Sequence, residues 1–152
     1  MITNFDGFTV TGITARTDNS REMTGNGVIA KMWERFIQEG IGAKIPGRTD
    51  HDLLALYTDY ESDQHGEYTY IVGARVAPGT PAPEGMVSKQ VPDARYQMVP
   101  SERGPVWRVV PEAWQRIWRE PLQRTFQVDF EVYGERAANP EDAVVEIWLG
   151  IK

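Results

Sequence analysis

The chain has 152 residues, and its 22 acidic and 16 basic side chains give a net charge of −6. This length favours one domain, and a composition of 41% hydrophobic and 25% charged residues is ordinary for a globular protein. Without cysteine, and with only His51 and His65 as histidines, disulfides and Cys-ligated metals are excluded and a histidine metal centre is disfavoured. The acidic balance disfavours nucleic-acid binding. The unusual feature is an aromatic content of 11%.

The N-terminal segment has neither the basic start nor the apolar run of a signal peptide. No stretch approaches the roughly 20 apolar residues that a membrane span needs. We therefore expect no membrane association, and a cytoplasmic location by default.

The first half of the chain predicts a strand, a helix and a hairpin. Residues 8–17 alternate in polarity, as strands do. Residues 27–39 carry apolar side chains three and four positions apart, which predicts an amphipathic helix that ends at Gly40. The runs 53–60 and 67–76 are rich in β-forming residues and are joined by a polar loop, which predicts a hairpin.

The second half repeats this order after a linker. Three prolines and two glycines in residues 77–85 mark the break. A strand is expected within 86–99 and a helix over 106–122. A first-turn proline is tolerated, so Pro111 leaves Val110 as an alternative start of this helix. Strands are then expected at 126–133 and 143–151.

Short local likenesses support a duplication. Residues 32–36, Met-Trp-Glu-Arg-Phe, resemble residues 113–117, Ala-Trp-Gln-Arg-Ile, and residues 71–73 resemble 148–150. We predict a single α+β domain over 1–152, with repeat one at about 1–77, a linker at 78–85 and repeat two at about 86–152. Two such β-α-β-β units would pack with pseudo-two-fold symmetry around a central ligand groove.

The last two strands suggest what lines the groove. Because side chains alternate along a strand, one face of each is aliphatic, and we expect both aliphatic faces to pack on the helices. The opposite faces would then bring together two acids and two large rings: Glu131, Tyr133, Glu146 and Trp148.

Acids among rings favour a cationic ligand. A carboxylate removed from water costs several kcal/mol unless it is paired. A lipophilic cation supplies the partner, and each ring face adds about 0.5–2 kcal/mol by cation–π attraction. The alternative is that Glu131 and Glu146 lie exposed and pair with arginines across the sheet.

Other rings are assigned by position alone. Tyr68, Tyr70 and Tyr57 belong to the first hairpin, and either face of it could line the groove. Trp107, just before the second helix, is a further candidate wall. The helix tryptophans are expected in the core: Trp33, Trp114 and Trp118.

These residues resemble the GyrI-like effector-binding domains of the SOUL-like superfamily, and within them the stand-alone, integron-associated type. The likeness runs over essentially the whole chain. Its most specific segments are residues 68–73, Tyr-Thr-Tyr-Ile-Val-Gly, and the closing Glu146-Ile147-Trp148 strand.

The resemblance implies SHS2-type β-α-β-β units around a groove that binds lipophilic, often cationic, compounds. Glu131 matches the family's central glutamate, and Glu146 matches a second acid found in some members. Regulators of this family often carry a DNA-binding unit ahead of the domain. Here the domain is expected to start at the first residues, so we expect no direct nucleic-acid binding.

The resemblance leaves three functions open. The first is a small-molecule binding or sequestering protein with no cofactor and no metal. The second is a hydrolase of strained-ring natural products, in which Glu131 and Tyr133 would act on an activated water. The third is a gyrase-inhibitor-like regulator with a protein partner, and a homodimer also remains open.

Overall fold

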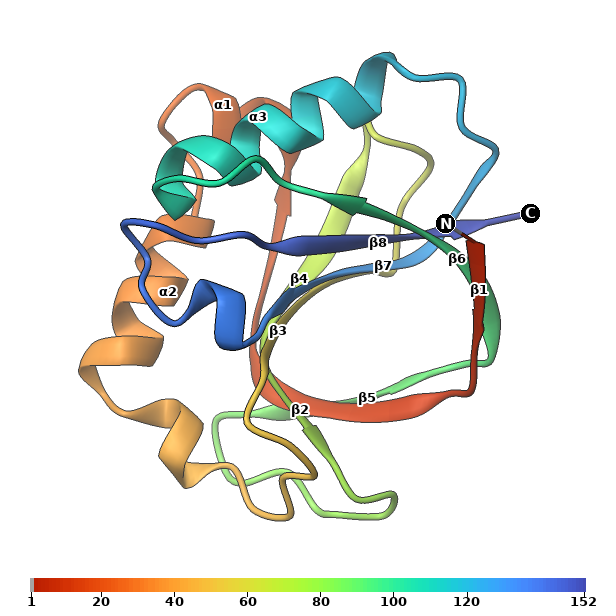
Figure 1. Ribbon diagram of the computed structural model, residues 1–152. Helices are drawn as coiled ribbons and strands as arrows, with labels where there is room; N and C mark the ends of the chain where they lie inside the picture. Colours follow the sequence, from red (N-terminus) through yellow and green to blue (C-terminus); the bar gives the residue numbers. More distant parts are fainter. Residues whose placement is uncertain (1) are drawn as a thin grey trace.

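The computed structural model describes residues 2–152, which form one curled antiparallel sheet with helices on one side (Figure 1). The strand order is β1-β6-β8-β7-β3-β4-β2-β5. The elements in chain order are β1 (Ile2–Phe5), β2 (Phe8–Asp18), α1 (Asn19–Met23), α2 (Ile29–Gln38), η1 (Ile41–Lys44), β3 (Leu53–Thr58), β4 (Glu67–Val76), β5 (Val87–Val91), β6 (Ala94–Pro100), α3 (Val106–Arg119), β7 (Arg124–Tyr133), η2 (Glu135–Ala137) and β8 (Glu146–Ile151).

The predicted α+β fold is confirmed, and its two halves repeat the same order of elements. Each half runs strand, helix, strand, strand: β2-α2-β3-β4 and then β6-α3-β7-β8. In the sheet these read β6-β8-β7 against β3-β4-β2, so β3 and β7 pair at the centre, antiparallel. This arrangement is the one that the predicted pseudo-two-fold symmetry requires.

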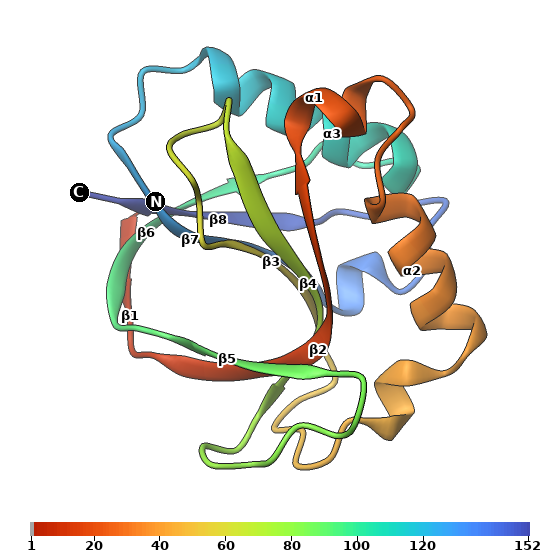
Figure 2. The ribbon, with the colours of Figure 1, turned by 180° about the vertical axis from the view of Figure 1, so that it is seen from behind.

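One long ribbon curls the sheet into a half-barrel. The β1–β6 and β2–β5 ladders share a single register, from Ile2 opposite Gln97 to Gly12 opposite Val87. Only residues 6–7 and 92–93 interrupt it. The same ribbon also joins β4 on one side and β8 on the other, so the strands enclose an interior, seen from behind in Figure 2.

The curled sheet has a core on each face. Between sheet and helices lie Phe36 of α2, Ile117 of α3, Val145 just before β8, and Ile147 and Leu149 of β8. The interior of the half-barrel holds a second cluster, which comprises Val10, Leu54, Leu56, Ile71, Val91, Tyr96, Val128, Phe130, Val132 and Trp148.

The helix boundaries follow local chemistry. In α2, Met32 and Phe36 form the buried stripe, while the apolar Ile37 lies exposed. Gly40 follows in the left-handed conformation at φ 60°, which confirms it as the stop. The predicted start of the second helix at residue 106 is confirmed, and the alternative start at Val110 is wrong: α3 begins at Val106, with Pro105 in extended conformation as its cap.

None of the helices formed by residues 2–152 has the length and apolar character needed to cross a bilayer.

Candidate functional site

A buried carboxylate lies between the sheet and α3. Glu131 of β7 is 1% exposed and accepts three hydrogen bonds. The hydroxyls of Tyr57 and Tyr133 donate to it at 2.6 Å each, and Nε1 of Trp114 donates at 2.7 Å. Within residues 2–152 it forms no ion pair, so all its partners are neutral.

Strand pairing explains how three elements meet at this carboxylate. β3 lies beside β7 with Ala55 opposite Glu131, so only a methyl group flanks the acid on that side, and Ile147 of β8 lies opposite it on the other side. Tyr57, two residues further along β3, lies on the same face. α3 crosses above and supplies Trp114 from its buried stripe.

Glu131 and its three donors, Tyr57, Tyr133 and Trp114, form an acid–aromatic box, and further rings extend it. Tyr57 contacts Tyr68 and Tyr70 with ring centroids 5.2 and 5.1 Å apart, and Tyr70 is its cross-strand neighbour on β4. Nε1 of Trp33 donates to the Tyr70 hydroxyl at 2.8 Å, and its ring lies 4.7 Å from that of Tyr133. Both helices therefore cover the acid with aromatic side chains.

The carboxylate in this box is buried without a positively charged partner among the described residues. Burial raises the pKa of Glu131, and the hydrogen bonds from Tyr133, Tyr57 and Trp114 oppose that rise without cancelling it. Burial, and then the nearby Glu131 charge, raises the pKa values of Tyr57, Tyr70 and Tyr133 well above normal. The tyrosines thus remain neutral donors at physiological pH.

The structure brings together five of the eight predicted ligand residues: Glu131, Tyr133, Tyr57, Tyr68 and Tyr70. It also decides which face of the first hairpin meets the acid, because the three tyrosines belong to the helix-side core.

Glu146 and Trp148 lie on the other face, which corrects the predicted grouping. Trp148 is opposite Phe130 in the β7–β8 ladder and stacks on it inside the half-barrel, with ring centroids 6.2 Å apart. Nε1 of Trp148 donates to Glu146 at 3.2 Å.

The error has a physical cause. Aliphatic side chains were expected to mark the helix side, and this holds for β8. On β7 it is wrong, because Val128, Phe130 and Val132 fill the half-barrel interior. A sheet that curls on itself buries both faces, so an aliphatic face does not identify the side that carries helices.

Two tryptophan assignments also change. Trp107 is 72% exposed at the start of α3, so the structure does not bring it to the acid. Trp114 belongs to the core, as expected of a helix tryptophan, but it also donates to Glu131. Sequence reasoning missed that role because apolar helical spacing gives no sign of an indole hydrogen bond.

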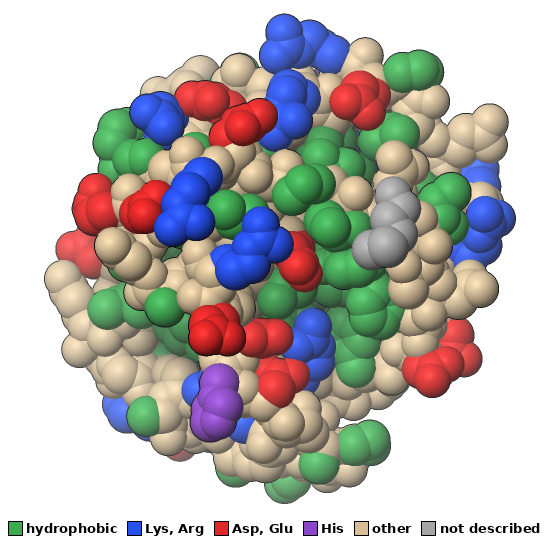
Figure 3. All heavy atoms as spheres, in the orientation of Figure 1, with side chains coloured by type: hydrophobic (Ala, Val, Ile, Leu, Met, Phe, Trp, Pro, Cys, Tyr) green, Lys and Arg blue, Asp and Glu red, His purple; other side chains and the backbone are tan. Residues whose placement is uncertain are grey.

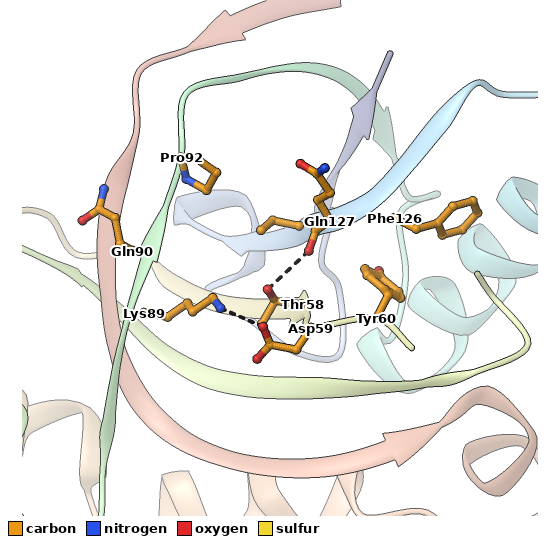
Figure 4. Close-up of a pocket in the computed structure, with 9 residues that line it drawn as sticks. Thr58, Asp59, Tyr60, Lys89, Gln90, Pro92, Phe126 and Gln127 are labelled. Atoms are coloured by element: carbon orange, nitrogen blue, oxygen red, sulfur yellow. Dashed lines mark hydrogen bonds and ion pairs between the residues drawn. The ribbon is translucent and has the colours of Figure 1, made fainter. Parts of the chain in front are cut away.

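An open pocket of about 330 Å³ lies elsewhere, at one mouth of the half-barrel (Figure 4). An ion pair spans it, with Nζ of Lys89 2.8 Å from Asp59. Asp59 and Phe126 both have positive φ, at 51° and 54°, which is uncommon for residues other than glycine. The lining consists of Thr58, Asp59, Tyr60, Lys89, Gln90, Pro92, Phe126, Gln127 and Val128.

In the orientation of Figure 1, Figure 3 shows acidic and basic side chains interspersed over the surface in view, with no broad area of one sign. Among residues 2–152 no group of three or more histidine, aspartate or glutamate side chains is placed to hold a metal ion.

This fold, with a buried acid among rings beneath two helices, defines the class of GyrI-like effector-binding domains. The family model for Cass2, the integron-associated effector binding protein, matches residues 1–151. The chain therefore belongs to the Cass2 family of effector binding proteins.

Individual relatives agree with this assignment. The putative transcriptional regulator protein YobU of Bacillus subtilis is 32% identical over 154 residues, covering 99% of this chain and 96% of YobU. An integron cassette protein of Vibrio cholerae superimposes with a TM-score of 0.77 at 29% identity, covering 100% of this chain and 95% of that one.

A third similar structure is SAV2435 bound to tetraphenylphosphonium. It matches with a TM-score of 0.80 at 17% identity, covering 100% of this chain and 93% of SAV2435. At that identity the likeness concerns the fold.

Proposed function

We propose that this protein binds lipophilic cationic compounds in the box around Glu131. The observation that carries the proposal is a fully buried carboxylate surrounded by rings and held only by neutral donors. A buried acid in this state gains most from a positive charge, since Coulomb attraction is strong where water is excluded.

The neighbouring acid on the same strand serves as an internal comparison. Asp129 is also fully buried among rings, but it has its own cation, Arg124, whose Nη2 lies 2.7 Å away. Glu131 has no such partner within the described residues. An acid without a resident cation is what a binding site for an external cation requires.

Ring faces favour a cation that is bulky and weakly hydrated. Six aromatic side chains gather around Glu131: Trp33, Tyr57, Tyr68, Tyr70, Trp114 and Tyr133. They attract positive charge through their π faces and offer few acceptors to a hydrogen-bonding ion. Tetraphenylphosphonium, the ligand of SAV2435, has this chemistry and is the probe of choice.

The test is a calorimetric titration of tetraphenylphosphonium into the wild-type protein, Glu131→Gln and Glu146→Gln. Glu146→Gln is the matched control, because both acids precede a large ring by two residues and only Glu131 lies in the box. We expect Glu131→Gln to weaken binding at least tenfold, about 1.4 kcal/mol, and the control to stay within about twofold. Equal affinities of all three proteins would refute the proposal.

A further inference from the structure

A second acid–aromatic box adjoins the first. Asp129 is 0% exposed, and its Oδ1 accepts the backbone N–H of Gly150 at 2.8 Å. Its Oδ2 accepts from Arg124 Nη2 at 2.7 Å and from the hydroxyl of Tyr60. Asp129 and Glu131 are two residues apart on one strand face, which separates their backbones by about 7 Å.

The cation in this box, Arg124, is held by one ion pair and two ring faces. The Arg124 side chain is 4% exposed, and only its Nη2 has a hydrogen-bond partner within residues 2–152; Nε and Nη1 have none. Its Cζ lies 4.3 Å from the ring centre of Phe126 and 5.7 Å from that of Trp114. One carboxylate and two ring faces therefore hold a buried cation, much as they would hold a lipophilic ligand.

A bulge in β7 makes this arrangement possible. Arg124 and Asp129 are five residues apart, which on a regular strand would place them on opposite faces. The pairing with β8 shifts between them, because Arg124 is opposite Ile151 and Asp129 is opposite Leu149. The extra residues, with Phe126 at positive φ, turn the arginine back over the acid.

The two boxes share one wall. Trp114 donates from Nε1 to Glu131 and presents its ring to Arg124. A ligand charge at Glu131 therefore lies one indole away from a fixed positive charge.

We propose that Arg124 is the built-in occupant of a second cation box and a specificity-determining residue that limits the ligand to one positive charge. The inference rests on the proposed function of Glu131. A second charge on the ligand would find Asp129 already neutralised and would be repelled by the guanidinium. Monocations meet no such penalty, because Glu131 is the one vacant acid of the pair.

The first experiment compares a monocation with a dication. Tetraphenylphosphonium and a bis(trimethylammonium)alkane, with its charges spaced to match the two acids, are titrated into wild type, Arg124→Ala and Arg124→Lys. We expect Arg124→Ala to raise the ratio of dication to monocation affinity at least tenfold, and Arg124→Lys to keep the wild-type ratio. An unchanged ratio in Arg124→Ala overturns the proposal.

The second experiment is chemical rescue, which does not involve Glu131. Millimolar methylguanidinium should raise the melting temperature, or the folded fraction, of Arg124→Ala by several degrees or severalfold. It should leave wild type and the double variant Arg124→Ala/Asp129→Asn unchanged. Lack of rescue shows that the Asp129 box takes no external cation and overturns the inference. If methylguanidinium rescues Arg124→Ala but the wild-type protein does not bind tetraphenylphosphonium, the Glu131 proposal alone is refuted.

Discussion

Glu131 stands out among the residues because its surroundings stabilise it only in part. Three neutral donors satisfy its oxygens, yet burial still raises its pKa. A buried acid of this kind is tolerated at a functional site and is rarely kept for stability alone. Asp129, with Arg124 beside it, shows the stable alternative on the same strand.

The raised pKa of Glu131 predicts how stability depends on pH. The group holds its proton more tightly in the folded state, so its contribution is most favourable below the ordinary glutamate pKa and is lost as pH rises through the folded value. Glu131→Gln removes this loss. Between about pH 4 and 7, urea unfolding should therefore show the variant gaining stability relative to wild type as pH rises.

Cation affinity should follow the opposite course in the same range. A protonated Glu131 offers no charge, so tetraphenylphosphonium binding by wild type should weaken as pH falls through the raised pKa. The hydroxyls of Tyr57 and Tyr133 stay protonated throughout, since their own pKa values are raised. Affinity independent of pH between about 4 and 7 would contradict this assignment.

Among the elements, the pairing of β2 with β4 includes a point where two glycines face each other. Gly12 is opposite Gly73, and a Cβ on Gly73 would lie 1.9 Å from the carbonyl oxygen of Thr11. A Cβ on Gly12 would lie 2.0 Å from the carbonyl oxygen of Val72. The two backbones therefore lie too close for a side chain at either position.

Gly73→Ala should therefore be costly, because backbone atoms cannot move aside as side chains can. We expect a loss of about 2 kcal/mol or more in the free energy of unfolding. Gly134→Ala is the control, since its nearest neighbour is the end of the Asp52 side chain at 3.1 Å, and it should cost less than about 1 kcal/mol. Similar losses for the two variants would show that the close approach matters little.

The whole molecule has two cores with separate roles. The half-barrel interior, around Leu56 and Phe130, carries no part of the acid box, while the helix-side core contains it. Stability and binding should therefore respond to different substitutions.

Leu56→Ala tests this separation. Removing a fully buried side chain from the interior should cost about 2–5 kcal/mol, measured by urea unfolding. Tetraphenylphosphonium affinity of the folded protein should stay within about twofold of wild type. Ile71→Val, at about 0.5–1.5 kcal/mol, gives a milder second point. A parallel tenfold loss of affinity in both variants would contradict two separable roles.

Sequence by itself determined the elements, the α+β class and the family. The spacing of apolar residues, the turn residues and the family motifs are all local properties of the chain. It also singled out Glu131 and Tyr133, which lie two apart on one strand. It assigned the wrong face of β7 to the helices, since a curled sheet buries both faces.

Only the tertiary structure separated Glu146 and Trp148 from Glu131, because that separation depends on the register of β7 against β8. It also decided the roles of Trp114 and Arg124. The indole reaches Glu131 across a helix–sheet interface, and the arginine reaches Asp129 through a bulge that breaks strand alternation. Contacts of this kind join residues whose spacing in the chain carries no signal. The rings and acids that stand out in the composition lie in two adjoining boxes: Arg124 pairs with the acid of one, and the acid of the other has only neutral donors.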